Sequence, residues 1–134
     1  MKTRNASSRW LWIIALTLSV LSHEAAAQDE VNTGYFGNVA IKGYDPVSYF
    51  TPGAAERGSP EYALDWLGAS WHFVSEEHKQ AFEADPIRYA PQYGGYCAVG
   101  MAEDTLTRDI DPEAFIIIDG KLYLNYSTEV GGLL

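Results

Sequence analysis

The sequence predicts a small α+β domain in which short antiparallel hairpins pack against one main helix. Three observations support this class: two hairpin patterns, one capped helical stretch between them, and a composition of 47% hydrophobic and 13% aromatic residues. A chain of 134 residues has the length of one domain. This composition is typical of a folded chain with a packed core rather than of a disordered one.

The first hairpin is predicted from residues 62–66 and 70–74, which flank the turn residues 67–69. In the second of these strands Trp71 and Phe73 fall on the same face, because side chains alternate along a strand. We therefore expect the two aromatic side chains to face the core.

A helix is predicted to begin after Ser75 and to run to about Asp85. The serine can accept hydrogen bonds from the first backbone amides, and the two glutamates that follow it favour a helix N-terminus. His78 and Phe82 lie four positions apart, so both are expected on the inward face. A further helical turn is expected at 87–89.

A second hairpin is predicted from 114–118 and 121–125, because Asp119-Gly120 is a favoured two-residue turn. The glycine-rich and aromatic segment 91–101 is expected to be packed. Weaker patterns predict a short strand at 39–41 and either a second strand or a single helical turn at 47–50. The proline- and glycine-rich residues 51–60 are predicted to form a surface loop.

Residues 1–27 have the three parts of a secretory signal peptide. Basic residues come first, the apolar run 10–21 is too short to span a bilayer, and Ala25-Ala26-Ala27 provides a cleavage site. The expected product is a single domain, 28–134, that is periplasmic or secreted, and an uncleaved N-terminal anchor is the alternative. The cleaved domain would meet a membrane only through the signal peptide during export.

Residues 28–134 carry six basic and 17 acidic side chains, a formal charge of −11. Such a chain would repel nucleic acid, so a nucleic-acid partner is excluded. The charge is consistent both with simple solubility and with attraction of cations, and charge alone does not decide between them.

Cys97 is the single cysteine, so no internal disulfide is possible. A lone thiol in an exported chain is open to oxidation unless it is buried, bound to a ligand or paired with another chain. All three possibilities stay open at this point.

Several motifs together resemble the YHS domain: Asp45-Pro46-Val47, the run 71–82, and Asp85-Pro86-Ile87-Arg88-Tyr89. The segments 92–98 and 119–126 are similar to those of stand-alone exported YHS proteins of bacteria. The resemblance covers residues 35–126. It implies a small α+β module of the kind found in metal-handling proteins, including heavy-metal transport ATPases.

Metal-linked YHS modules often carry cysteines at the positions that hold Ser48, Val74 and His78 here. Only His78 keeps ligand chemistry, so a metal role does not carry over directly. Similar proteins also continue into a further helix, which is expected to be missing from a chain that stops after 127–134.

A soft-metal site is the first functional hypothesis. Imidazole, thiolate and thioether ligands favour Cu(I), with Zn(II) second, and His78, Cys97 and Met101 are the candidate ligands, with His72 a further possibility. The chain would then be a metal-binding accessory protein, with a metal ion or a metal-handling protein as its partner. Each of these residues can instead be ordinary packing.

The alternative is a structural or binding module without metal that recognises a protein or a small molecule. Its pocket would be lined by Tyr44, Asp45, Tyr93 and Tyr96, although the tyrosines can equally belong to the core. No enzyme is expected, because the sequence has no nucleophile elbow, phosphate loop or paired-cysteine motif. The acidic run 104–113 lacks the spacing of a calcium loop, and the sequence leaves the oligomeric state open.

Overall fold

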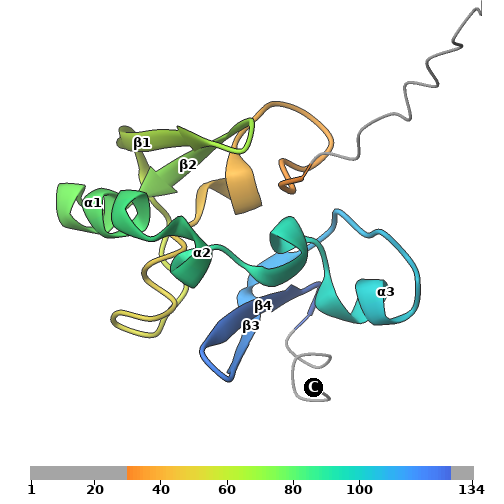
Figure 1. Ribbon diagram of the computed structural model, residues 1–134. Coiled ribbons are helices and arrows are strands. Elements are labelled where there is room, and N and C mark those ends of the chain that lie inside the picture. Colours follow the sequence, from red (N-terminus) through yellow and green to blue (C-terminus); the bar gives the residue numbers. More distant parts are fainter. Residues whose placement is uncertain (1–29, 128–134) are drawn as a thin grey trace, which may run out of the picture.

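The computed structural model describes residues 30–127 as a small α+β domain with two antiparallel hairpins, one main helix and several short helices, as predicted (Figure 1). In chain order the elements are the 3₁₀ turn η1 (Ala40–Gly43), β1 (Ser59–Trp66), β2 (Ala69–Phe73), α1 (Glu76–Ala84), α2 (Pro86–Tyr89), η2 (Gln92–Gly95), α3 (Ala98–Ala102), β3 (Asp111–Ile118) and β4 (Lys121–Asn125).

The two hairpins form separate two-stranded sheets. β1 pairs with β2 around Leu67-Gly68, and β3 pairs with β4 around Asp119-Gly120. Both turn residues of each pair have positive φ, which is the geometry of a type I′ turn and matches the twist of the strands. The second turn is the predicted one. The first connection is one residue shorter than predicted, because Ala69 already belongs to β2.

Helix α1 begins where the sequence predicted. Ser75 Oγ accepts a hydrogen bond from the backbone amide of His78 at 3.2 Å and so caps the helix. The helix ends before Asp85, whose side chain caps α2 through the amide of Arg88 at 3.3 Å. The predicted further turn is therefore α2, beginning one residue earlier at Pro86.

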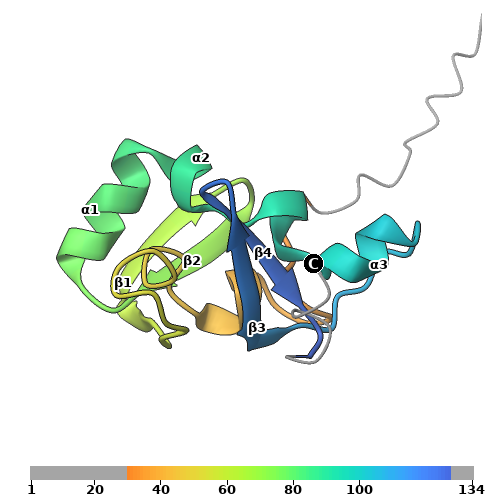
Figure 2. The same ribbon diagram turned by 90° about the horizontal axis from the view of Figure 1, so that it is seen from below.

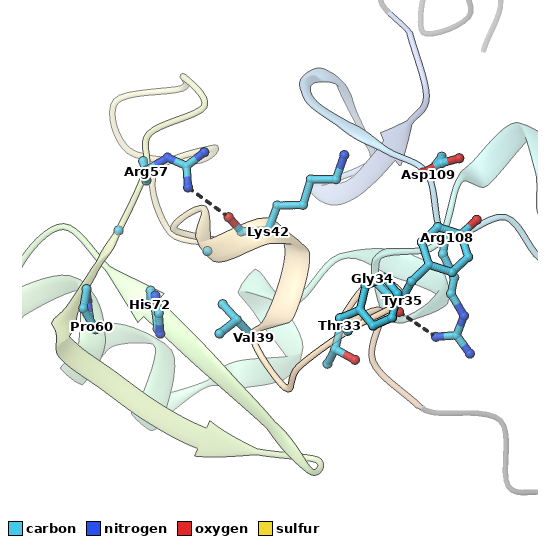
Figure 3. Close-up of a pocket in the computed structure, with 13 residues that line it drawn as sticks. Thr33, Gly34, Tyr35, Val39, Lys42, Arg57, Pro60, His72, Arg108 and Asp109 are labelled. Carbon is cyan, nitrogen blue, oxygen red and sulfur yellow. Dashed lines mark hydrogen bonds between the residues drawn. The ribbon is translucent and has the colours of Figure 1, made fainter.

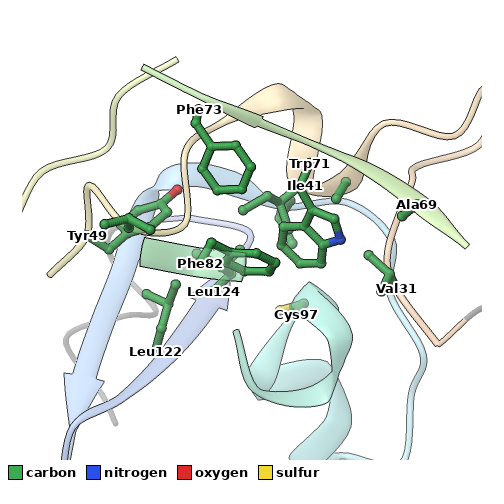
Figure 4. Packing of buried hydrophobic residues seen from close by; sticks show 13 residues of the cluster. Val31, Ile41, Tyr49, Ala69, Trp71, Phe73, Phe82, Cys97, Leu122 and Leu124 are labelled. Carbon is green, nitrogen blue, oxygen red and sulfur yellow. The ribbon is translucent and has the colours of Figure 1, made fainter. Parts of the chain in front are cut away.

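The core lies between the two hairpins and the inner face of α1 (Figure 4). Trp71 and Phe73 of β2 are fully buried, as predicted, and the ring of Phe82 from α1 lies 5.1 Å and 5.3 Å from their rings. Leu122 and Leu124 of β4 close the cluster from the opposite side. In both views α1 and α3 lie at opposite ends of the molecule, with β3–β4 between them (Figures 1 and 2).

The prediction of a short strand at 39–41 is wrong. Only Val39 makes a strand-type bridge, to Ser70, and the chain then enters a left-handed turn with Ile41 at φ 41° and Lys42 at φ 57°. The buried Asn32 holds this turn, because its carbonyl accepts from the amide of Ile41 at 3.0 Å. Tertiary contacts have overridden the β propensity of the Val-Ala-Ile run.

Residues 47–50 form a single turn rather than a strand, since the amides of Phe50 and Thr51 both donate to the carbonyl of Val47. The predicted loop 51–60 is irregular up to Gly58, and β1 begins at Ser59. The predicted signal peptide and C-terminal segment lie outside the described residues, apart from Ser127. Within residues 30–127, no helix has the length and apolar character needed to cross a membrane.

Candidate functional site

Asp45 and His78 form a carboxylate–histidine pair. Asp45 is fully buried, and its Oδ2 lies 2.7 Å from Nδ1 of His78. The same carboxylate accepts backbone amides from Val47 and Val74 at 2.8 Å and from Ser48 at 3.3 Å. Asp45 thus ties the turn after η1 to the end of β2 and to α1.

The hydrogen bond from Asp45 sets the chemistry of the imidazole. An ionised carboxylate can only accept, so Nδ1 of His78 carries a proton and Nε2 carries the lone pair when the ring is neutral. The side chain of His78 is 19% exposed. Its ring therefore offers one oriented nitrogen that can bind a metal ion or accept a proton.

The three positions that the family resemblance connects with metal ligands meet at this pair. Ser48 Oγ lies 3.5 Å from Nδ1 of His78 and donates to Glu56 Oε2 at 2.7 Å. Val74 contributes its backbone amide to Asp45. The sequence named Asp45 and His78 for two different sites, whereas the structure brings them into one.

Cys97 and Met101 lie elsewhere. Cys97 is fully buried in the core cluster, immediately before α3, and its carbonyl accepts the amide of Met101 at 3.0 Å (Figure 4). His78 belongs to α1, which lies at the opposite end of the molecule from α3, the helix that contains Met101 (Figures 1 and 2). In residues 30–127, no group of three or more His, Cys, Asp or Glu side chains is arranged to hold a metal ion. The donors of this part of the chain thus do not make a complete soft-metal site by themselves.

The four residues predicted to line one pocket have different surroundings. Asp45 is buried in the pair with His78, the ring of Tyr44 lies under the guanidinium of Arg57, and Tyr96 is buried against Arg108. Tyr93 is 53% exposed and lines a smaller, mainly apolar pocket of about 280 Å³ beside Trp66.

A larger pocket of about 600 Å³ lies beside η1 and β2 (Figure 3). Arg57, Pro60 and His72 lie on one side of it, and Tyr35, Arg108 and Asp109 lie on the other. Val39 and Lys42 lie between the two sides. The lining combines cationic groups with apolar and aromatic ones, which is typical of a small-molecule site.

Positive charge is concentrated at this pocket. Lys42, Arg57 and Arg108 are three of only six Lys and Arg residues in 28–134, where acidic residues number 17. Lys42 Nζ donates to the carbonyl of Ile110 at 2.6 Å, and Arg57 donates to the carbonyl of Lys42 at 3.4 Å. Among residues 30–127, no carboxylate lies within ion-pair distance of Lys42 or Arg57. Neither charge is therefore neutralised by a neighbouring acid in this part of the chain.

The backbone that carries these cations is strained and tightly packed. The left-handed conformation costs about 1–3 kcal/mol at a residue other than glycine, and a β-branched residue such as Ile41 rarely adopts it. This left-handed turn places Lys42 at the pocket. Opposite, the amide of Gly58 donates to the carbonyl of Gly43 at 2.9 Å, and a Cβ at Gly58 would collide with the backbone of His72. The loop that carries Arg57 can thus approach β2 closely.

This pocket was not predicted from the sequence. Its cations come from three distant segments, so no local motif marks them. The one usable signal was their scarcity: in so acidic a chain, each basic side chain is a candidate for a specific role.

Comparison of the chain with protein-family models, with curated proteins and with solved structures finds no match.

Proposed function

We propose that this protein is an exported binding module, without catalytic activity, that captures a small anionic molecule in the pocket lined by Lys42, Arg57 and Arg108. The observation that carries the proposal is the concentration of half of the Lys and Arg side chains of 28–134 at one pocket. Outside the lining, 28–134 has 16 acidic and only three basic side chains, whereas the lining has three basic residues and one acidic residue, Asp109. An anion is therefore attracted to this pocket more than to the rest of the chain.

The charges of Lys42 and Arg57 support this proposal most directly. Both side chains are exposed, and the groups they contact in residues 30–127 are backbone carbonyls and the ring of Tyr44. A carbonyl does not neutralise a cation, so both can still attract a carboxylate or phosphate. Arg57 can form two parallel hydrogen bonds to such a group.

The test is a titration of the purified protein with phenyl phosphate and, as a cation of similar size, benzyltrimethylammonium. We expect only the anion to bind and to shift the NMR amide resonances of Gly43 and Gly58. Arg57→Gln should weaken binding about tenfold, or about 1.4 kcal/mol. Lys121→Gln removes a charge from the distant β3–β4 turn and should leave the affinity unchanged. Absence of anion binding, or equal binding of the cation, would contradict the proposal.

A second candidate function is a metal-handling accessory role, favoured by the orientation of His78. The hydrogen bond to Asp45 fixes the imidazole and leaves Nε2 of this partly exposed side chain as a single nitrogen ligand, for Cu(I) first and Zn(II) second. A partner protein would have to supply further ligands, because the described donors do not form a set. In this second candidate the resemblance to the YHS domain and its metal association stays a prediction.

Anaerobic titration with Cu(I) and Zn(II) tests the second candidate. If His78 is a ligand, His78→Ala should weaken binding about tenfold while Cys97→Ala should not. Equal binding by the wild-type protein and both variants would remove His78 from any metal site.

A further inference from the structure

We infer that the molecule captured in this pocket is an aromatic organic anion, with its charged group at Lys42 and Arg57 and its ring against Tyr35 and Phe36. This inference rests on the proposed function and specifies its ligand class. Two independent features of the pocket carry it: its size, and the exposed aromatic side chains at its edge.

The size of the pocket argues against an inorganic ion. A volume of about 600 Å³ lies within the range of about 300–1,000 Å³ that is typical of sites for drug-sized molecules. A phosphate or acetate ion at the cations would leave most of this space to water. A ligand that fills it needs an organic body beside its charge.

Tyr35 and Phe36 supply a surface for that body. Phe36 is 95% exposed and Tyr35 is 66% exposed. This exposure is unfavourable, because the transfer of an aromatic ring out of water lowers the free energy. Both line the pocket. Gly34 and Gly37, which flank them, have no atom within 4 Å of their Cβ positions, so the space around this turn is open, although the amide and carbonyl of Gly34 are hydrogen-bonded to Asn32 and Arg108. The aromatic pair is therefore free to pack against a ring that enters the pocket.

The apolar part of the remaining lining agrees with an amphipathic anion, and Asp109 is the one acidic residue of the lining. Val39 and Pro60 are apolar and lie between and beside the cationic groups (Figure 3). An aromatic ring can also stack on a guanidinium such as that of Arg57, which already lies 5.0 Å from the centre of the Tyr44 ring. Charge and aromatic surface thus occur together in one pocket.

The experiment compares phenyl phosphate with inorganic phosphate, and benzoate with acetate, by calorimetric titration of the wild-type protein and of Phe36→Ser. The expected result is that each aromatic anion binds at least tenfold more tightly than its small counterpart, and that Phe36→Ser removes most of this difference. Because Phe36 is almost fully exposed, its substitution should not disturb folding. Tyr126→Ser, at an exposed site outside the pocket lining, is the matched control and should behave as wild type.

The outcomes separate this inference from the proposed function. If inorganic phosphate and acetate bind as tightly as the aromatic anions, and Phe36→Ser changes nothing, the aromatic ligand class is wrong while anion capture stands. If none of the four anions binds at millimolar concentration, both the aromatic ligand class and the proposed anion capture are wrong. A loss confined to the aromatic anions in Phe36→Ser supports both.

Discussion

Asp45 and His78, 33 residues apart in the chain, are joined by a 2.7 Å hydrogen bond in which the carboxylate is fully buried and the imidazole stays partly exposed. The carboxylate also accepts three backbone amides, so it organises the chain around it while it orients His78. Asp45 therefore stabilises the fold, and any chemistry of His78 depends on Asp45.

Asp45→Asn should therefore destabilise the protein strongly. An amide group has only one acceptor oxygen, so at least one of the four donors now bonded to Asp45 would lose its partner inside the protein. A buried hydrogen-bonding group that is left without a partner costs about 1–3 kcal/mol, and more beside a charged group, so we expect a loss of about 3 kcal/mol. Urea unfolding measures this loss. Asp65→Asn, at an exposed position of β1, should stay within about 0.5 kcal/mol of wild type, and equal effects of the two substitutions would refute a central role for Asp45.

Gly94→Ala should lower the free energy of unfolding more than a glycine-to-alanine change in an open turn does. Gly94 has φ 64°, and a Cβ there would collide with the carbonyl oxygen of Glu30. Backbone strain and overpacking each cost about 1–3 kcal/mol, so we expect a loss of more than about 2 kcal/mol. Gly120→Ala is the control, because φ is similar at 73° but no atom lies within 4 Å of the added Cβ. Thermal unfolding of both variants checks the difference, and similar losses would show that packing at Gly94 is unimportant.

The regular elements could be predicted because their signals are local. The alternation of Trp71 and Phe73, the cap at Ser75 and the Asp119-Gly120 turn each determine structure within a few residues. The left-handed turn at Ile41 could not be predicted, since this residue type avoids positive φ and contacts with distant segments hold it there.

The candidate site shows the same limit. Asp45 and His78 were each singled out from the sequence, but no local pattern predicts that they meet. Lys42, Arg57 and Arg108 form one pocket only after η1, the loop before β1 and the segment before β3 have packed together. The net charge of the whole chain does not reveal such a local concentration of basic residues.

Tyr49 gives a prediction for alkaline pH. Burial raises the pKa of its phenol above the ordinary value, and nearby ionisable groups, among them Asp111, Asp45 and Glu113, raise it further. The folded protein therefore keeps this proton when the unfolded chain has lost it. The stabilisation is complete below about pH 10, the ordinary tyrosine pKa, and declines as pH rises above it, by at most about 1.4 kcal/mol per pH unit.

Urea unfolding at pH 8 and pH 11 tests this effect with Tyr49→Phe. The variant should lose about 1–2 kcal/mol at pH 8, because the carbonyl of Pro112 loses the 2.9 Å hydrogen bond from the hydroxyl. Between the two pH values it should lose less stability than wild type does, since it has no phenol to ionise there. Tyr126→Phe, at an exposed site, should keep the wild-type slope. An unchanged slope in Tyr49→Phe would assign the alkaline effect to other groups.

The burial of Cys97 predicts a thiol that reacts only on unfolding. Its side chain is fully enclosed by the core cluster, so a thiol reagent should modify the native protein no faster than the protein unfolds, with or without a chelator. Cys97→Ala should cost about 1–2 kcal/mol through the small cavity that it leaves, and Cys97→Ser should cost more, because the hydroxyl is placed among apolar side chains. Rapid labelling that begins only after a chelator is added would instead show a thiol protected by metal. Such a result would restore Cys97 as a ligand and would require a native conformation in which it leaves the core.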